Sequence, residues 1–378
     1  MFINKNFPIG LNITDESIKL IQLTKKKGKP RVLAIAKINL PPAAVVDGEI
    51  KQKEILAKAL KKAWESSEFG KFTTDEVAVS LPEQKTFIKL IEIEKNPNDI
   101  ANIIEAEIEK HIPFQIKDIY YDWQIVKKLP DKELILIGAA PKKLVDDYAD
   151  AIEEAGLSVA AMEIESVSVC RSFFPEKNDK IINNYALLNI GPTKTSLIIY
   201  AQGIIIFTMN MPISGKEITE KISSYLQLND QLSEKAKSIC GLTANKAQGI
   251  IKNILIDSID SLTNKINEAI EFYQNHFPFF GAINKIILCG SEACLKDLDK
   301  IIALNTKIPA ETGDITANLS SCQDKLFIMF KEKQCQNINL IKNNKTANGD
   351  KDASAENTIT YATAIGLALR EIFRSDYL

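Results

Sequence analysis

The chain has 378 residues, of which 45% are apolar and 25% charged, and its 47 basic and 49 acidic side chains leave a formal net charge of -2. This length exceeds one compact core, so we expect two to four domains of roughly 100 to 200 residues each. The balanced charge argues against nucleic acid as the main partner, because binding through phosphates needs a clustered basic surface. Arginine, the residue best suited to bidentate phosphate recognition, occurs only at Arg31, Arg171, Arg370 and Arg374.

The cysteines and histidines argue against a metal centre. The six cysteines contain no CxxC pair and do not cluster with the only two histidines, His111 and His276. Zinc sites, iron–sulfur sites and a disulfide scaffold are therefore not expected. The N-terminus turns polar before a signal peptide could form, and Lys194 and Gln202 interrupt the most apolar stretch. We expect a cytoplasmic protein without direct membrane insertion.

The start of the chain predicts a sheet. Apolar and polar residues alternate there, and turn formers separate three runs rich in β-branched residues. We predict an antiparallel meander with strands over residues 8–13, 18–23 and 32–40. A helix over 53–64 and a fourth strand over 77–81 follow.

Residues 85–159 form a unit of their own in the sequence pattern. Its predicted order is strand, helix, strand, strand, helix, strand, which is typical of a small α+β module. The predicted elements are a strand over 86–93, a helix over 97–111, strands over 120–126 and 134–140, and a helix over 141–155 closed by Gly156.

After a polar connection, the opening pattern begins again. A second meander is predicted over residues 185–190, 196–200 and 204–209. Leu188-Asn189-Ile190-Gly191 then occupies the same turn as Leu11-Asn12-Ile13-Thr14, which indicates a duplicated architecture. The other predicted elements are helices over 216–228, 232–239, 244–249, 254–277, 293–302 and 361–373, a strand over 285–289, and a mobile polar loop over 331–357.

The two equivalent turns carry the candidate chemistry. Successive backbone N–H groups in a tight turn form an anion-binding concavity, so two such turns in related halves can hold a triphosphate between them. The turns are residues 12–17, with Lys19 behind them, and residues 189–195. Each turn alone is more simply interpreted as an ordinary polar hairpin, and the pairing of two equivalent turns favours the ligand-binding interpretation.

Five sequence pieces in order make a resemblance specific. The chain resembles the actin-like ATPase superfamily and, within it, the PilM family of cytoplasmic type IV pilus assembly proteins, which is related to the division protein FtsA. The resemblance extends from Ile9 to Arg370. Its pieces are LPPAAVVDGEI at 40–50, EAEIEKHIPF at 105–114, YDW at 121–123, EAGL at 154–157 and AIGLALR at 364–370.

The resemblance implies an α/β, actin-like (ribonuclease H-like) duplicated fold. Two related halves would surround a nucleotide cleft, and one half would carry the inserted subdomain of FtsA and PilM. The implied divisions are subdomain 1A at 1–84, 160–182 and 358–378, inserted subdomain 1C at 85–159, subdomain 2A at 183–215 and 280–330, and subdomain 2B at 216–279.

The resemblance also assigns nucleotide-binding positions. Two phosphate motifs fall on the two turns, a glycine pair on Ser214 and Gly215, and the adenosine motif on a strand end. Glu and Lys three residues apart share one helical face, where the superfamily contacts the nucleoside. The assigned residues are Asn12, Thr14, Asp15, Glu16, Ser17, Lys19, Asn189, Gly191, Thr193, Thr195, Gly215, Glu234, Lys237, Gly290 and Ser291.

Departures from the motifs weaken the catalytic interpretation. Asn12 and Asn189 replace the two acids that would position hydrated magnesium, and an amide is a poorer partner for Mg²⁺ than a carboxylate. Thr14 and Ser291 add side chains where the family has glycine. Losing both acids should slow phosphoryl transfer, which depends on positioning and charge neutralisation. ATP binding stays open, effective hydrolysis is not expected, and no residue is assigned as catalytic or as a metal ligand.

Three further features have simpler interpretations. His111 has no Ser, Cys or metal partner nearby in sequence, so we interpret it as structural. The aromatic residues Tyr120, Tyr121 and Trp123 favour a core strand over a partner groove. Through the AIGLALR piece, the resemblance implies that the apolar helix at 361–373 lies inside the fold. We do not expect an FtsA-like membrane anchor, since few residues follow Arg370.

The favoured function is therefore a scaffold. The resemblance implies binding to the N-terminal cytoplasmic peptide of a PilN-like inner-membrane protein, in a groove lined by residues around 85–159, and coupling to the pilus assembly motor complex. The protein would be peripheral to the inner membrane through this partner, and a homo-oligomer is left open. The alternatives are an active actin-like ATPase that cycles between open and closed states and an FtsA-like cell-division protein. Ile338-Asn339-Leu340-Ile341 resembles the partner's peptide motif, so self-occupation of the groove is a minor hypothesis.

Overall fold

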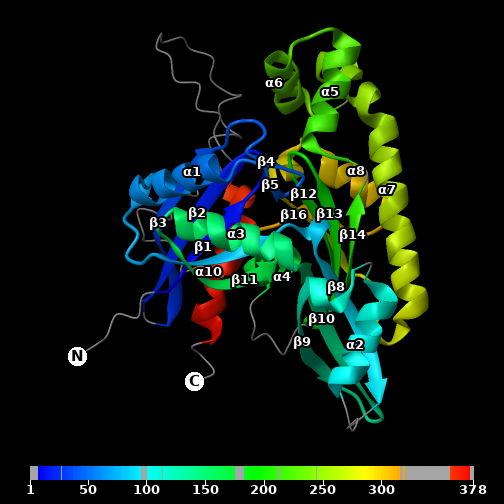
Figure 1. The fold of residues 1–378 in the computed structure, drawn as a ribbon. Coiled ribbons are helices and arrows are strands. Elements are labelled where there is room, and N and C mark those ends of the chain that lie inside the picture. The colour runs from blue at the N-terminus through cyan, green and yellow to red at the C-terminus, as the bar shows by residue number, and fades with distance from the viewer. Residues whose placement is uncertain are drawn as a thin grey trace. The chain divides into compact units, whose positions relative to one another are not determined.

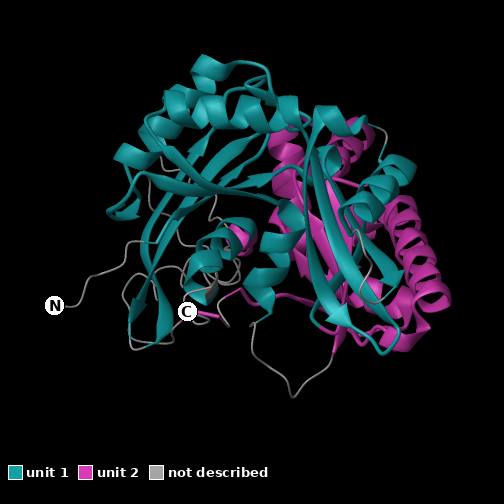
Figure 2. Ribbon diagram, turned by 60° about the horizontal axis from the view of Figure 1, so that its bottom comes forward, with its two compact units in different colours: residues 1–177, 203–208, 363–378 teal, residues 178–202, 209–362 magenta. Residues whose placement is uncertain are grey.

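The computed structural model describes residues 7–26, 28–94, 100–112, 114–174, 183–211, 213–243, 245–315, 318–319 and 358–374. The predicted loop at 331–357, including Ile338-Asn339-Leu340-Ile341, lies outside these residues. The chain divides into two units (Figure 2). The first comprises Met1–Lys177, Gly203–Thr208 and Thr363–Leu378, and the second comprises Asn178–Gln202 and Met209–Ala362.

The first unit is built on a six-stranded sheet with the strand order β11-β7-β1-β2-β3-β6. Figure 1 labels its strands β1, β2, β3 and β11. Strands β1, β2 and β3 form the predicted antiparallel meander. Strand β7 pairs in parallel with β1, and β11 pairs in parallel with β7. The strands are β1 Ile9–Ile13, β2 Ser17–Lys26, β3 Lys29–Asn39, β6 Phe69–Gly70, β7 Glu76–Leu81 and β11 Ser158–Ile164.

Helices cover both faces of this sheet, because its strands carry apolar or small residues on both sides. Ile9 and Leu11 enter the core formed with α1 and α3. Gly10 alternates to the opposite face, where a Cβ atom would lie 2.0 Å from the Ala364 carbonyl oxygen of α10. Because Gly10 has no side chain, α10 can pack directly against β1. The prediction that the helix at 361–373 lies inside the fold is confirmed. The helices are α1 Lys53–Glu65, α3 Lys142–Glu154, α4 Glu165–Phe173 and α10 Ala362–Arg374.

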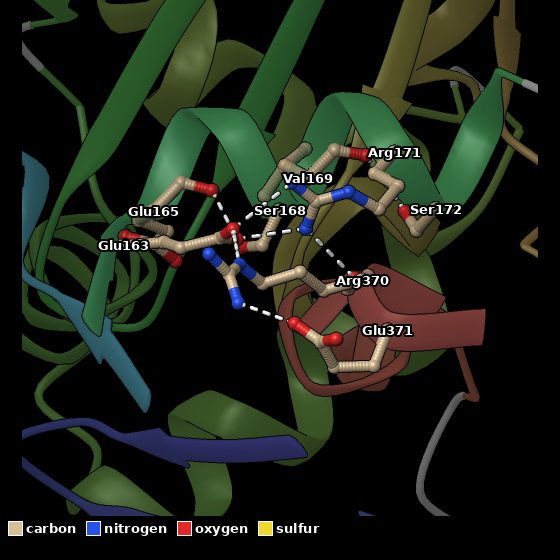
Figure 3. A network of polar contacts seen from close by, with 9 residues as sticks. Glu163, Glu165, Ser168, Val169, Arg171, Ser172, Arg370 and Glu371 are labelled. Atoms are coloured by element: carbon tan, nitrogen blue, oxygen red, sulfur yellow. Dashed lines mark hydrogen bonds and ion pairs between the residues drawn. The ribbon is translucent and has the colours of Figure 1, made fainter. Parts of the chain in front are cut away.

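An ion-pair cluster fixes α4 and α10 to β11 (Figure 3). Arg171 donates to both oxygens of the Glu163 carboxylate, at 2.7 and 3.1 Å, and Arg370 Nε donates to the same group at 2.6 Å. Arg171 also donates to the Gly366 carbonyl at 3.0 Å. A Cβ atom on Gly366 would lie 1.7 Å from the Ser168 carbonyl oxygen of α4. Two of the chain's few arginines therefore hold its last helix in place.

A smaller antiparallel sheet, in the order β8-β10-β9, has a core of its own with α2. Tyr121 and Trp123 pack partly against this core, as predicted. The prediction was wrong for Tyr120, which is 48% exposed because it alternates to the other face of β9. Helix α3, which follows β10, packs instead in the core of the six-stranded sheet. The elements are β8 Phe87–Glu94, α2 Ile100–His111, β9 Ile119–Lys128 and β10 Lys132–Pro141.

A five-stranded sheet repeats the strand plan of the six-stranded one. Its order, β14-β13-β12-β15-β16, matches β3-β2-β1-β7-β11 strand for strand. Four of its strands lie in the second unit, whereas residues 204–208 of β14 are assigned to the first unit. Strands β12 and β13 are antiparallel, and β15 adds to β12 in parallel, as β7 adds to β1. The elements are β12 Asn184–Ile190, β13 Thr195–Ala201, β14 Ile204–Met211, α5 Gly215–Leu226, α6 Asp230–Cys240, α7 Ile250–His276, β15 Lys285–Cys289, α8 Leu298–Thr306 and β16 Ala310–Thr312.

Two predicted helices differ from the structure. The helix expected over 244–249 is only a 3-10 turn, η3, in which Gln248 has a φ of 54°. The helix expected over 293–302 begins later, because Asp297, with a φ of 64°, precedes α8. No described helix is both long and apolar enough to cross a membrane. The remaining short elements are β4 Val45–Val46, β5 Glu49–Ile50, η1 Glu83–Lys85, η2 Ile116–Asp118, η3 Ala247–Gly249, η4 Pro278–Phe280, η5 Ser291–Cys294 and η6 Thr358–Tyr361.

Candidate functional site

The first predicted turn joins β1 to β2 and is closed by its own hydrogen bonds. Thr14 N donates to the Ser17 carbonyl at 2.9 Å, and Ser17 N donates to the Thr14 hydroxyl at 3.1 Å. Asn12 lies opposite Lys19 in the strand register, and Ser80 Oγ donates to Asn12 Oδ1 at 3.2 Å. The amide at position 12 therefore has a partner within the first unit.

Two lysines, one buried and one half-buried, lie side by side behind this turn. Lys19 is 8% exposed, and it is opposite Lys37 of β3 in the register. Burial lowers the pKa of Lys19 to about 8, although the carboxylates of Glu165 and Glu16 act in the other direction. Burial, together with the neighbouring charge of Lys19, also lowers the pKa of Lys37 to about 8. Sequence reasoning missed Lys37, although a lysine within an apolar alternating strand was a visible signal.

Asp15 has a structural role that sequence analysis did not assign. Its carboxylate accepts hydrogen bonds from the backbone N–H groups of Asp47 and Gly48, at 3.1 and 2.9 Å. These two residues form the turn between β4 and β5, with φ values of 53° and 75°. An Asp-Gly pair favours such a hairpin turn. Glu16, in contrast, is exposed, and its carbonyl accepts from Leu40 N at 2.7 Å.

The second predicted turn is closed in the same way as the first. Gly191 N donates to the Lys194 carbonyl at 2.8 Å, and a Cβ atom on Gly191 would lie 2.7 Å from that oxygen. The turn also receives the start of α5. Gly215 N donates to the Gly191 carbonyl at 3.1 Å, and Lys216 N donates to the Pro192 carbonyl at 2.7 Å. Two backbone N–H groups at the start of α5 therefore donate to carbonyl groups of this turn.

Two threonines among the assigned nucleotide-binding residues, Thr193 and Thr195, lie in or beside this turn. Thr193 lies half-buried within the turn. Thr195 begins β13 and is 2% exposed, and its hydroxyl has no hydrogen-bond partner among the described residues. A buried hydroxyl without a partner is costly. A phosphate oxygen is one group that would satisfy it, so Thr195 fits the expected ligand.

A buried lysine connects the helices of the second unit. Lys237 is 4% exposed, and its Nζ lies 2.8 Å from Glu234 Oε2 and 2.9 Å from Glu292 Oε2. It also donates to the Thr219 hydroxyl at 3.1 Å and to the Gly215 carbonyl at 3.4 Å. Thr219 in turn donates to Glu234 at 2.7 Å. Helical spacing therefore did place Glu234 and Lys237 on one face.

The adenosine motif lies against the end of β12. Gly290 has a φ of 89°, and a Cβ atom there would lie 2.4 Å from the Ile190 carbonyl oxygen and 2.7 Å from Asn189 Oδ1. Only glycine fits this approach without a shift. Ser291 Oγ donates to Glu292 Oε1 at 3.3 Å, which joins the motif to the lysine network.

The structure thus gathers the predicted residues into two groups, one in each unit. Within the second unit, contacts connect Gly191, Gly215, Lys237 and Glu234. Sequence reasoning missed Thr219 and Glu292 in this group, since their contacts involve segments far apart in the chain. The described residues contain no group of three or more His, Cys, Asp and Glu side chains that could hold a metal ion. The amides of Asn12 and Asn189 do not fit the carboxylate positions that hydrated Mg²⁺ prefers.

A pocket of about 230 Å³ lies between β8 and α2, inside the segment expected to contribute to a peptide groove. Its walls are mostly aliphatic and aromatic. Lys89 contributes a cation whose pKa is lowered by burial. Glu107, on the opposite wall, pairs with Lys110 at 2.7 Å and with His111 at 3.3 Å. The lining residues are Phe87, Ile88, Lys89, Ile91, Glu107, Ile108, His111, Ile112 and Ile137.

Comparisons with solved structures identify the fold. A PilM-PilN type IV pilus biogenesis complex superposes with a TM-score of 0.75 at 19% identity, covering 97% of this chain and 98% of that chain. Ethanolamine utilization protein EutJ of Carboxydothermus hydrogenoformans gives 0.54 at 12% identity, with 97% and 90% covered. MreB5 of Spiroplasma citri bound to ADP gives 0.51 at 13% identity, with 90% and 100% covered. These likenesses confirm an actin-like fold.

Family comparison is more specific than the fold. The model of the type IV pilus assembly protein PilM matches residues 10–327, which include both turns, the inserted segment and the lysine network. This range covers most of the chain. The chain therefore belongs to the type IV pilus assembly protein PilM family.

Proposed function

We propose that this protein is a cytoplasmic scaffold of type IV pilus assembly. It binds the N-terminal cytoplasmic peptide of a PilN-like inner-membrane protein and couples the assembly motor to the envelope complex. The observation that carries the proposal is the family match over residues 10–327. The structural neighbour whose title names a PilM-PilN complex supports the choice of partner.

The chemistry of the site also favours a scaffold over a catalyst. Neither Asn12 nor Asn189 can supply the negative charge that would hold a hydrated metal at a phosphate. In the second unit, Lys237 already has two carboxylates within 2.9 Å. No catalytic base is assigned to either group, so the residues present fit binding better than hydrolysis.

Calorimetry with the purified protein tests the proposal. The probe is the N-terminal cytoplasmic peptide of the PilN-like protein encoded by the same organism, and a scrambled peptide of equal composition is the control. We expect saturable binding of the native sequence only. A folded protein, verified by its thermal unfolding transition, that binds neither peptide would overturn the scaffold function.

Nucleotide binding without effective hydrolysis is the second candidate. The unpartnered Thr195 hydroxyl favours it, together with the grouping of Gly215, Lys237 and Ser291 beside the second turn. The actin-like neighbour MreB5 was solved with ADP bound, which is a property of that protein. ATP titration measures binding, and phosphate release with Mg²⁺ measures hydrolysis. Release that falls when Lys19 is changed to alanine would favour the ATPase alternative instead.

A cell-division role predicts different behaviour. An FtsA-like protein would form filaments and attach to membranes through its own tail. The last described helix, α10, is instead fixed in the first unit by Arg370 and Gly366. Cosedimentation with anionic liposomes, in the absence of the PilN-like partner, distinguishes the two roles, and the scaffold proposal expects the protein to stay in the supernatant.

A further inference from the structure

The Lys237 ammonium has a complete set of partners inside the second unit. An ammonium group has three N–H donors. At Lys237 they face Glu234, Glu292, the Thr219 hydroxyl and the Gly215 carbonyl, all within 3.4 Å. The side chain is 5% exposed, so water does not compensate for a lost partner. An anionic ligand could contact this cation only by displacing one of these groups.

Glu292 is the more deeply placed of the two carboxylates. Its side chain is 14% exposed, whereas that of Glu234 is 55% exposed. Glu292 occupies space that a side chain at position 215 would fill, because a Cβ atom on Gly215 would lie 2.6 Å from Glu292 Oε1. Gly215, which sequence analysis assigned to ligand binding, therefore leaves room for the carboxylate of Glu292.

The local charge follows from this arrangement. One ammonium and two carboxylates give the cluster a formal charge of about -1, which repels phosphate at short range. A half-buried carboxylate and a ligand phosphate that use the same cation compete directly, since both cannot approach it at contact distance without strong repulsion. The electrostatics therefore favour the ligand-free arrangement.

We infer that Glu292 is an internal competitor of nucleotide phosphate: its carboxylate holds Lys237 in the arrangement seen here and must leave before a phosphate group can bind. This inference rests on the proposed nucleotide site and makes Glu292 the residue that sets its affinity. The ligand class is a phosphate group carried by an adenine nucleotide. Neither adenosine, which lacks the charge, nor inorganic phosphate, which lacks the nucleoside, should reproduce the effect.

The Glu292→Gln variant tests the competition, because it keeps the side chain's size and removes its charge. ATP, adenosine and inorganic phosphate are titrated separately into the full-length protein by calorimetry. We expect ATP affinity to rise at least about tenfold over the unmodified protein, which corresponds to about 1.4 kcal/mol. Adenosine affinity should stay within about twofold, and inorganic phosphate alone should show no comparable gain.

Two further variants keep the inference falsifiable if Glu292→Gln folds poorly. Glu234→Gln removes the exposed carboxylate of the same lysine and should give a smaller gain in the same direction. Glu311→Gln removes an exposed acid whose pairing with Lys285, at 3.1 Å, lies elsewhere, and it should change nothing. The inference is wrong if ATP affinity falls or stays unchanged in a folded Glu292→Gln protein, or in Glu234→Gln where Glu292→Gln does not fold. It is also wrong if no form of the protein binds ATP. Peptide binding, measured in the same preparations, separates that outcome from failure of the scaffold function.

Discussion

The cluster around Glu163 should make a large contribution to the stability of the first unit. Replacing this residue by glutamine removes the carboxylate that both Arg171 and Arg370 contact. The side chains of Glu163, Arg171 and Arg370 are 11%, 14% and 23% exposed, so the two cations left behind are poorly solvated, although Arg370 keeps its pair with Glu371 at 2.6 Å. Removing one member of a buried ion pair costs about 3–5 kcal/mol. The remaining amide oxygen can accept one hydrogen bond, so we expect a loss of about 3 kcal/mol.

Tryptophan fluorescence can follow this unit selectively. The chain's two tryptophans, Trp64 and Trp123, both lie in the segment Met1–Lys177 of the first unit. Urea unfolding monitored at these residues should show a lower midpoint for Glu163→Gln with little change in slope. In a unit of this size, 3 kcal/mol corresponds to a melting temperature lower by about 6–12 °C.

A matched control separates burial from charge. Asp147→Asn removes one member of the exposed pair with Lys143 on α3, in the same unit, and it should cost less than about 0.5 kcal/mol. Arg171→Met, combined with Glu163→Gln in a double-mutant cycle, should give a coupling energy above about 1 kcal/mol. If Glu163→Gln costs less than about 1 kcal/mol, apolar packing alone holds α10, and the assigned role of the cluster is wrong.

Three further predictions concern backbone packing, titration and metal dependence. Gly366→Ala should cost at least about 2 kcal/mol of unfolding free energy in the same urea assay, because its Cβ would lie 1.7 Å from the Ser168 carbonyl oxygen. Gly138→Ala is the control. Its Cβ would lie 3.3 Å from the flexible end of the Ile164 side chain, so it should cost less than about 1 kcal/mol. The pKa of Lys19 is about 8 in the folded protein and 10.5 in the reference state. Between pH 8 and pH 10.5 the unfolded state therefore binds more protons than the folded state. The unfolding free energy should rise with pH in this range by up to about 1.4 kcal/mol per pH unit, relative to the Lys19→Met variant. A constant difference between the two proteins across that range would contradict the burial of this amine. Changing both Asn12 and Asn189 to Asp should make ATP binding, measured by calorimetry, tighter in Mg²⁺ than in EDTA, while the unmodified protein should bind equally in both. Tighter binding of the unmodified protein in Mg²⁺ would show that the amides are not the limiting feature.

The sequence allowed the architecture to be predicted where local pattern and tertiary structure agree. Alternation and turn residues located both meanders, and the shared Asn-containing turn revealed the duplication. Helix α4 was missed because Ser and β-branched residues dominate Glu165–Phe173 and have low helix propensity. Its conformation depends on packing against α10, which lies far away in the chain. The β4–β5 hairpin, by comparison, carried an Asp-Gly signal that sequence analysis did not use.

Only those residues of the candidate site that belong to a sequence motif could be predicted. Spacing placed Glu234 beside Lys237, and the resemblance placed Gly215 and Ser291 near them. Glu292 could not be found in this way, because it joins the site through a gap left by a glycine. Lys37 gave a visible signal within its strand, but motifs do not show that strand register places it beside Lys19. Which polar groups share a buried space depends on the folded backbone, and single-sequence patterns do not contain that information.

The residues that make the family recognisable and those that would perform chemistry are largely different. Gly366 and Arg370, from one recognisable piece, pack and pin α10. Asp47 and Gly48, from another, form a turn that Asp15 holds. These contacts are independent of any ligand, so they would persist in a protein that had lost catalysis. The positions that depend on a ligand instead carry amides at both turns and a carboxylate at the buried lysine. A chain that retains the first set and alters the second keeps these packing contacts, while its chemistry depends on a few side chains that the proposed variants can restore.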